Sequence, residues 1–182
     1  MFGLFKRRMA PVDPVTYLNE ITIARPPEEV FPLIDLADPG YRQLAMGHDL
    51  VQLGEDEYLL TVTFAPNEPF RVKVSERRSP EYYETRTVLA PGMGTLDVLE
   101  EHYTLTRTAD NGTKVSTVTR ATFYPGLSWS RFGKELCFVS VATMNELRKL
   151  KLHAEQGEEA ARSVMLETDN RVLDRKLADG PA

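Results

Sequence analysis

Residues 21–39 read ITIARPPEEVFPLIDLADP, and within a few positions they change from the pattern of a strand to that of a helix. Residues 16–24 alternate well enough to predict a β-strand. Pro27 suits the first turn of a helix, and Glu28 and Glu29 lie where the positive end of the helix dipole favours carboxylates. The DPG sequence at residues 38–40 then ends this helix. We therefore predict one strand followed by two short helices, the second near residues 41–45.

From residue 48 to 124 the apolar side chains recur with a period of two. The clearest example is EYLLTVTF at residues 57–64, where alternate side chains are large and apolar. The segments between these runs are short and rich in Gly, Pro, Asn and Asp, which is typical of tight turns. The pattern predicts half-buried antiparallel strands at 49–54, 57–64, 70–76, 81–90, 96–108 and 113–124.

The segment ADNGTK, residues 109–114, contains an Asn-Gly pair that favours a two-residue hairpin turn, because both residues tolerate positive φ. Counting outward from such a turn places Tyr103 opposite Arg120 and puts Glu101 on the same face. The predicted register therefore turns a polar cluster of Glu101, Tyr103 and Arg120 toward the interior. A register error of one residue would turn this cluster outward.

The last long element is a predicted helix from about residue 128 to 156, ended by Gly157 in the usual place for a glycine after a helix. At 100° per residue one stripe is expected to face the sheet. Its members are Trp129, Phe132, Leu136, Val139, Ser140, Thr143, Leu147, Leu150 and Ala154. Ser140 and Thr143 are smaller than the aliphatic groups that fill a core, so they predict room for a cavity. Alternatively, both hydroxyls bond to carbonyls one turn earlier within a filled core.

A smaller apolar patch lies on the opposite side of this helix and consists of Phe138, Val141, Ala142 and Leu152. Two covers are open from the sequence. The segment after Gly157 has apolar residues at helical spacing and could fold back over the patch. The alternative is a homodimer contact through Phe138 and Val141.

The order of elements and two stretches resemble the START-related SRPBCC superfamily of polyketide-cyclase-like and plant-allergen-like proteins. The stretches are ITIARPPEEVFPLIDLADP and, at residues 123–157, FYPGLSWSRFGKELCFVSVATMNELRKLKLHAEQG. The likeness covers roughly residues 16–156. It implies an α+β helix-grip fold, in which a curved antiparallel sheet of about seven strands wraps the long C-terminal helix and leaves a cavity for a hydrophobic ligand. It does not imply one activity, because the superfamily includes lipid carriers, quinone-binding proteins, receptors, cyclases and aromatases.

Three segments follow from this interpretation: a flexible tail at 1–15, a START-like ligand-binding domain at 16–157, and an extension at 158–182 with a short helix. The first eight residues, MFGLFKRR, combine apolar and basic side chains. Residues 2–8 could make a weak peripheral membrane contact. The simpler interpretation is a frayed tail.

The bulk composition limits the remaining functions. A net charge of −5 over 182 residues argues against a nucleic-acid partner, which would need a clustered basic surface. The single Cys137, the lack of a signal peptide and the lack of a long apolar stretch fit a cytoplasmic protein. The three histidines are scattered without metal-site spacing, and no cofactor-binding motif is visible, so we expect no metal and no cofactor.

We expect the chain to bind a small hydrophobic or amphipathic ligand, such as a lipid, a quinone or a polyketide-like molecule, without catalysis. The predicted lining is Phe31, Val62, Phe64, Val72, Tyr103, Arg120, Trp129, Phe132, Leu136, Ser140, Thr143 and Leu147. The alternative is a cyclase or aromatase in which Arg120 holds a carbonyl or enolate oxygen while Glu101 or Tyr103 moves a proton. In a third interpretation the cavity is vestigial and the chain is a protein-interaction module. The simplest interpretation of the polar cluster is a salt bridge at the rim of the sheet.

Overall fold

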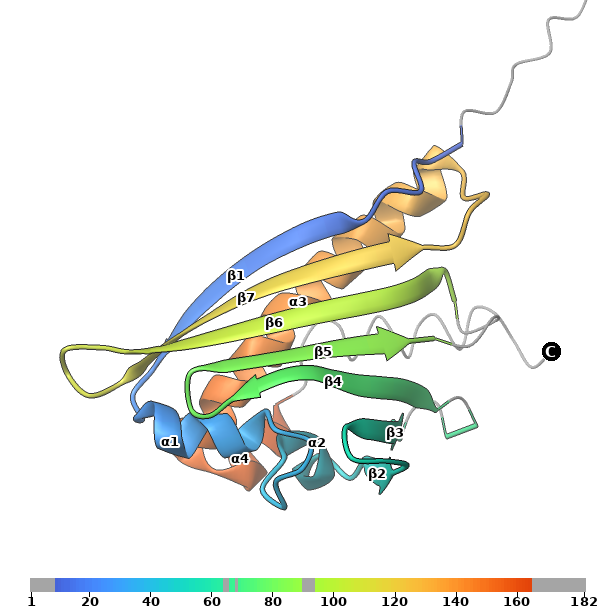
Figure 1. Cartoon of the computed structure of the whole chain (residues 1–182). Coiled ribbons are helices and arrows are strands. Elements are labelled where there is room, and N and C mark those ends of the chain that lie inside the picture. Colours follow the sequence, from blue (N-terminus) through green and yellow to red (C-terminus); the bar gives the residue numbers. More distant parts are fainter. Residues whose placement is uncertain (1–8, 64–65, 68, 90–93, 165–182) are drawn as a thin grey trace, which may run out of the picture.

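One antiparallel sheet of seven strands curves over a single long helix, α3 (Figure 1). The structure is a computed structural model and describes residues 9–63, 66–67, 69–89 and 94–164. The strands lie in the order β1-β7-β6-β5-β4-β3-β2, so every strand after β1 pairs with the next along the chain. Their bounds are β1 Val15–Ile23, β2 Asp49–Gln52, β3 Glu57–Thr61, β4 Phe70–Arg78, β5 Tyr82–Val88, β6 Leu96–Arg107 and β7 Thr113–Phe123.

Three short helical turns lie between β1 and β2: α1 Pro27–Val30, the 3-10 helix η1 Phe31–Leu33, and α2 Arg42–Ala45. Pro27 begins α1, as its fixed φ favours. The helix α3 spans Trp129–Gln156, and the Ser128 side chain caps it by accepting from the Arg131 N–H. At its other end Gly157 adopts a φ of 91° and begins α4, Glu158–Ser163. The α+β helix-grip architecture predicted from the sequence is therefore confirmed.

The interior has two separate apolar clusters. The larger contains buried residues of β4, β5, β6 and the α1–η1 segment, against which Leu147 and Leu150 of α3 pack. The smaller lies nearer the start of α3, where the rings of Phe123 and Phe132 meet edge to face with centroids 5.4 Å apart. Helix α3 thus packs directly on the sheet at both clusters.

The register of the β6–β7 hairpin differs from the prediction by three residues. Arg107 pairs with Thr113, so the connection spans Thr108–Gly112. Of the Asn-Gly pair only Asn111 has positive φ, at 63°, and the Thr108 hydroxyl accepts from the Gly112 N–H at 2.9 Å. This side-chain bond stabilises a longer loop than the two-residue turn we predicted. An odd shift exchanges the two faces of β7.

The apolar stripe predicted for α3 is also partly wrong. Trp129 is 48% exposed, and Ser140 is exposed too, so neither faces the sheet. Thr143 is buried, but its hydroxyl donates to the Ser140 carbonyl at 3.1 Å and accepts from the Asn19 amide at 3.0 Å. Thr143 thus makes the bond to a carbonyl one turn earlier that the filled-core alternative predicts, whereas Ser140 is exposed and does not belong to the core.

Residues near both termini contact the domain. Met9 forms a β-bridge with Ser128, and the Ala10 N–H donates to the Leu127 carbonyl at 2.9 Å. In α4 Ala161 is fully buried, and this helix packs against α3 and α2 (Figure 1). The predicted membrane-contacting residues 2–8, and residues 165–182, lie outside the described part. No helix within the described part is long and apolar enough to cross a membrane.

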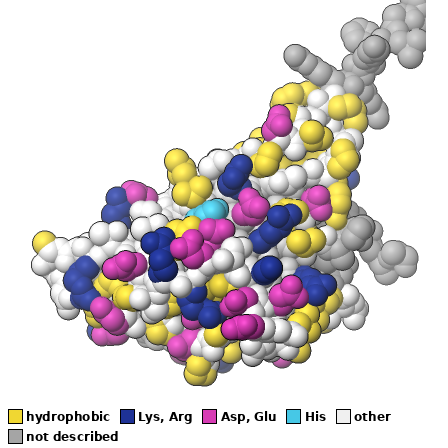
Figure 2. Space-filling model, in the orientation of Figure 1, with side chains coloured by type: hydrophobic (Ala, Val, Ile, Leu, Met, Phe, Trp, Pro, Cys, Tyr) yellow, Lys and Arg dark blue, Asp and Glu magenta, His cyan; other side chains and the backbone are white. Residues whose placement is uncertain are grey.

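The convex face of the sheet carries basic and acidic side chains interspersed with apolar ones (Figure 2). Leu18 and Val118 pair across β1 and β7 on this face and are 73% and 37% exposed. On β5, two strands from Val118, the Tyr82 hydroxyl donates to Glu84 at 2.7 Å.

Candidate functional site

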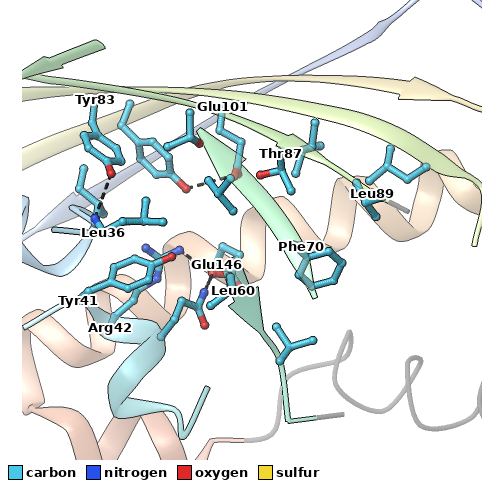
Figure 3. Close-up of a pocket in the computed structure, with 18 residues that line it drawn as sticks. Leu36, Tyr41, Arg42, Leu60, Phe70, Tyr83, Thr87, Leu89, Glu101 and Glu146 are labelled. Atoms are coloured by element: carbon cyan, nitrogen blue, oxygen red, sulfur yellow. Dashed lines mark hydrogen bonds and ion pairs between the residues drawn. The ribbon is translucent and has the colours of Figure 1, made fainter. Parts of the chain in front are cut away.

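A cavity of about 260 Å³ lies between the concave face of β3–β6 and the segment that carries η1 and α2 (Figure 3). Helix α3 contributes only Glu146 to its wall. The lining residues are mostly apolar, with a polar group at one end. They are Ile34, Leu36, Tyr41, Arg42, Gln43, Leu60, Val62, Phe70, Val72, Tyr83, Thr85, Thr87, Leu89, Leu96, Leu99, Glu101, Tyr103 and Glu146.

The segment after η1 is fixed to the sheet by a buried hydrogen bond. The Leu36 N–H donates to the Tyr83 hydroxyl of β5 at 3.0 Å. Asp38 then closes the DPG turn, because its carboxylate accepts from the Gly40 N–H at 2.7 Å. The turn leads directly into α2, so Tyr41 and Arg42 reach the cavity from the side opposite the sheet (Figure 3).

Arg42 is a buried cation, only 6% exposed, and it pairs with Glu146 of α3. Its guanidinium donates to Glu146 at 2.6 Å, and the Gln43 amide donates to the same carboxylate oxygen at 3.0 Å. Burial alone would lower the pKa of Arg42, but the Glu146 carboxylate and two nearby phenols raise it above its usual value. Arg42 therefore keeps its charge, and its bond to Glu146 holds α2 against α3.

Glu101 faces this pair from β6 on the other side of the cavity (Figure 3). The Tyr103 hydroxyl donates to it at 3.4 Å, which is long for a hydrogen bond between oxygens. Burial, reinforced by the negative charge of Glu146, raises the pKa of Glu101 to about 7, although Arg42 and Tyr103 act in the opposite direction. A carboxyl group of this kind can accept or release a proton near neutral pH.

The rest of the wall is hydrophobic, with Leu60, Phe70 and Leu89 among its members. An apolar chamber with a few convergent polar groups is the usual form of a small-molecule site. The geometry can hold an apolar body against the leucines and a polar end beside Glu101.

No family model matches the chain, and no curated protein matches it. Solved structures do. The crystal structure of Ara h 8.0201 aligns with a TM-score of 0.57 at 12% identity, covering 88% of this chain and 99% of that one. CalU16 from Micromonospora echinospora aligns with a TM-score of 0.58 at 13% identity, covering 93% and 88%. The di-domain ARO/CYC StfQ from the steffimycin biosynthetic pathway gives 0.58 at 16% identity, covering 78% and 51%. The chain therefore shares the helix-grip fold of these proteins. At these identities the likeness concerns the fold and says nothing of the ligand.

Four of the residues named from the sequence line the cavity between β3–β6 and α2: Val62, Val72, Glu101 and Tyr103. Phe31 lies behind the wall, where its ring meets Tyr83 edge to face. Phe132 and Leu136 belong to the smaller apolar cluster, Leu147 belongs to the larger one, and Trp129, Ser140 and Thr143 lie elsewhere. Phe64 is outside the described residues.

Arg120 does not line this cavity. It pairs with Glu100 in the sheet register and is exposed on the convex face, because the hairpin loop is longer than predicted. The same shift turns Thr117 and Thr119 of β7 toward the interior, in place of the inward Arg120 that a two-residue turn predicts. The cation of the site is Arg42 instead.

Tyr41, Arg42 and Glu146 are among the polar residues of the cavity that the sequence did not predict. Glu146 lies beside the apolar stripe of α3, where a charged residue normally indicates solvent. Arg42 follows a turn, and the sequence around it has no periodic pattern. The one available signal was the DPG turn, which placed a second short helix there without indicating its orientation.

Proposed function

We propose that the chain binds a small, largely apolar molecule in the cavity between β3–β6 and α2, with the polar end of that molecule beside Glu101. The cavity itself carries the proposal. Its volume of about 260 Å³ far exceeds that of one water, and its wall is mainly apolar. A dry cavity of about 150 Å³ already admits benzene, so a ligand with one or two rings fits this space, whereas a whole lipid does not.

A cavity-filling variant tests this proposal. Leu60 lines the cavity, and Leu18 is 73% exposed on the convex face. We expect Leu60→Trp to weaken binding of 2-naphthol, measured by saturation-transfer NMR and calorimetry, by more than roughly tenfold. Leu18→Trp, the matched control, should bind like the parent chain. Unchanged binding in a folded Leu60→Trp variant would place the ligand elsewhere. Native mass spectrometry of freshly purified protein would give the mass of a resident ligand.

One observation favours a second function, proton transfer on a bound ketone. The pKa of Glu101 is raised by burial to about 7, which suits a general base, and the Tyr41 and Tyr103 phenols lie in the same wall. A neutral phenol can donate to an oxygen that gains negative charge as a carbon-bound proton leaves.

The test of this second function is proton exchange in D₂O. We expect the chain to accelerate deuterium uptake at the carbon next to the carbonyl of 6-hydroxy-1-tetralone, followed by NMR. Glu101→Gln should abolish the acceleration while the compound still binds. Exchange at the same rate in both proteins would leave binding as the function.

A further inference from the structure

The charged groups that line the cavity do not balance. Among the described lining residues, Glu101 and Glu146 are acidic and Arg42 is basic. The guanidinium of Arg42 is already bonded to Glu146 at 2.6 Å. Its Nε is buried and has no hydrogen-bond partner among the described residues, but this atom does not reach the cavity surface. The charge of Arg42 is therefore already balanced by Glu146, which leaves Glu101 as the uncompensated charge among the described lining residues.

Glu101 has spare capacity to accept hydrogen bonds. An ionised carboxylate offers about four lone-pair sites, and the one hydrogen bond resolved for this side chain is that from Tyr103 at 3.4 Å. The leucines and valines of the wall offer no donor, and no hydrogen bond to Glu101 is resolved from Thr85, which lies opposite it in the β5–β6 register. A carboxylate held in an apolar wall is costly unless something donates to it.

We infer that the cavity selects ligands whose polar end donates a hydrogen bond to Glu101, such as a phenol, an alcohol or an amine, and rejects ligands that end in a carboxylate. This inference rests on the proposed function. A ligand hydroxyl supplies a second donor to Glu101, beside the long hydrogen bond from Tyr103. A ligand carboxylate would instead place a negative group against Glu101 in the apolar wall, where like charges repel strongly. Glu146 adds less to this repulsion, because its side chain is partly exposed and its charge is balanced by Arg42.

Three compounds of the same two-ring size separate these interactions: 2-naphthol donates, 2-methoxynaphthalene only accepts, and 2-naphthoate is an anion. At pH 8 we expect calorimetry to give 2-naphthol the tightest binding, with 2-naphthoate weaker by roughly a hundredfold and the ether weaker by roughly tenfold. At pH 5.5 the disadvantage of the naphthoate should shrink, because Glu101 then carries a proton.

The variant Glu101→Gln removes the charge and keeps the shape. We expect it to tighten 2-naphthoate at pH 8 by roughly tenfold or more. Glu100→Gln, on the opposite face of the same strand, is the matched control and should leave the three affinities unchanged. The compounds also separate the donor selectivity from the binding function. Equal affinity for all three in the parent chain would overturn the donor selectivity but leave the binding function standing. Failure of all three to bind would overturn the binding function and the selectivity with it.

Discussion

Glu101 lowers the stability of the folded protein when it is ionised, because its carboxylate lies in an apolar wall and faces a second carboxylate, Glu146. Arg42, the one cation among the described lining residues, stabilises Glu146 directly. A group that destabilises the fold and yet faces a cavity is characteristic of a site shaped for binding or catalysis. At the scale of single residues, the raised pKa of Glu101 therefore predicts how stability depends on pH.

Stability should fall as the pH rises across the range in which Glu101 loses its proton. The pKa of Glu101 is raised from 4.5 to about 7, so between these values the folded state holds a proton that the unfolded chain has released. Unfolding free energy then decreases with pH, by roughly 3 kcal/mol in total from this group, and the loss is complete above pH 7. Glu101→Gln should remove this slope and be more stable than the parent chain at pH 8, measured by urea unfolding. If Glu100→Gln flattens the slope equally, the slope does not come from the cavity.

At the scale of elements, the β6–β7 hairpin decides which side chains reach the interior. Its loop brings Gly112 against the end of β1, where a Cβ at this position would lie 2.7 Å from the Ile23 carbonyl oxygen and 3.0 Å from the Thr108 hydroxyl. Only a residue without a side chain fits there. The close approach fixes the longer loop and with it the face of each residue in β7.

Two glycine substitutions should therefore have opposite effects. We expect Gly112→Ala to lower the unfolding free energy by about 1–3 kcal/mol, because its Cβ would press on backbone that cannot move freely. Gly133 is exposed in α3 with no atom within 4 Å of the same position, so Gly133→Ala should raise stability by about 0.5–1 kcal/mol. Thermal and urea unfolding of both variants measure this. A neutral Gly112→Ala would mean that the loop can relax to the shorter turn.

The same hairpin explains how far the sequence could predict the site. Periodicity identified each strand and α3, because burial of one face imposes a repeat on the side chains. It also placed Glu101 and Tyr103 inward correctly. The register depended on one Asn-Gly pair, and the hydroxyl of Thr108 stabilised a different loop, which moved Arg120 to the convex face. Local turn preferences do not include such side-chain bonds. Arg42 and Glu146 meet only in the folded chain, 104 residues apart, so no local pattern could pair them.

At the scale of the whole molecule, the concave side of the sheet is filled at one end and hollow at the other. The filled end contains the Phe123–Phe132 pair and the first half of α3. The hollow end is covered by α2, a helix of only four residues, which is held by contacts outside itself. Arg42 ties it to α3, and the Arg162 guanidinium of α4 donates to the Ala45 carbonyl at 2.9 Å and 3.1 Å. Helix α4 thus supports α2, which lines the cavity on the side opposite the sheet.

A substitution that detaches α4 should therefore weaken ligand binding in the cavity. Ala161 is fully buried in α4, so Ala161→Asp would bury a carboxylate and should detach this helix, at a cost of more than about 2 kcal/mol. We expect faster hydrogen exchange of the backbone amides at residues 42–47 and weaker binding of 2-naphthol, because α2 then loses its contact with Arg162. Ser163→Asp adds the same carboxylate at an exposed position of the same helix and should change neither property. Faster exchange confined to residues 158–163 would show that α2 keeps its place without α4. The bond between Arg42 and Glu146 would then be enough to hold α2 over the cavity.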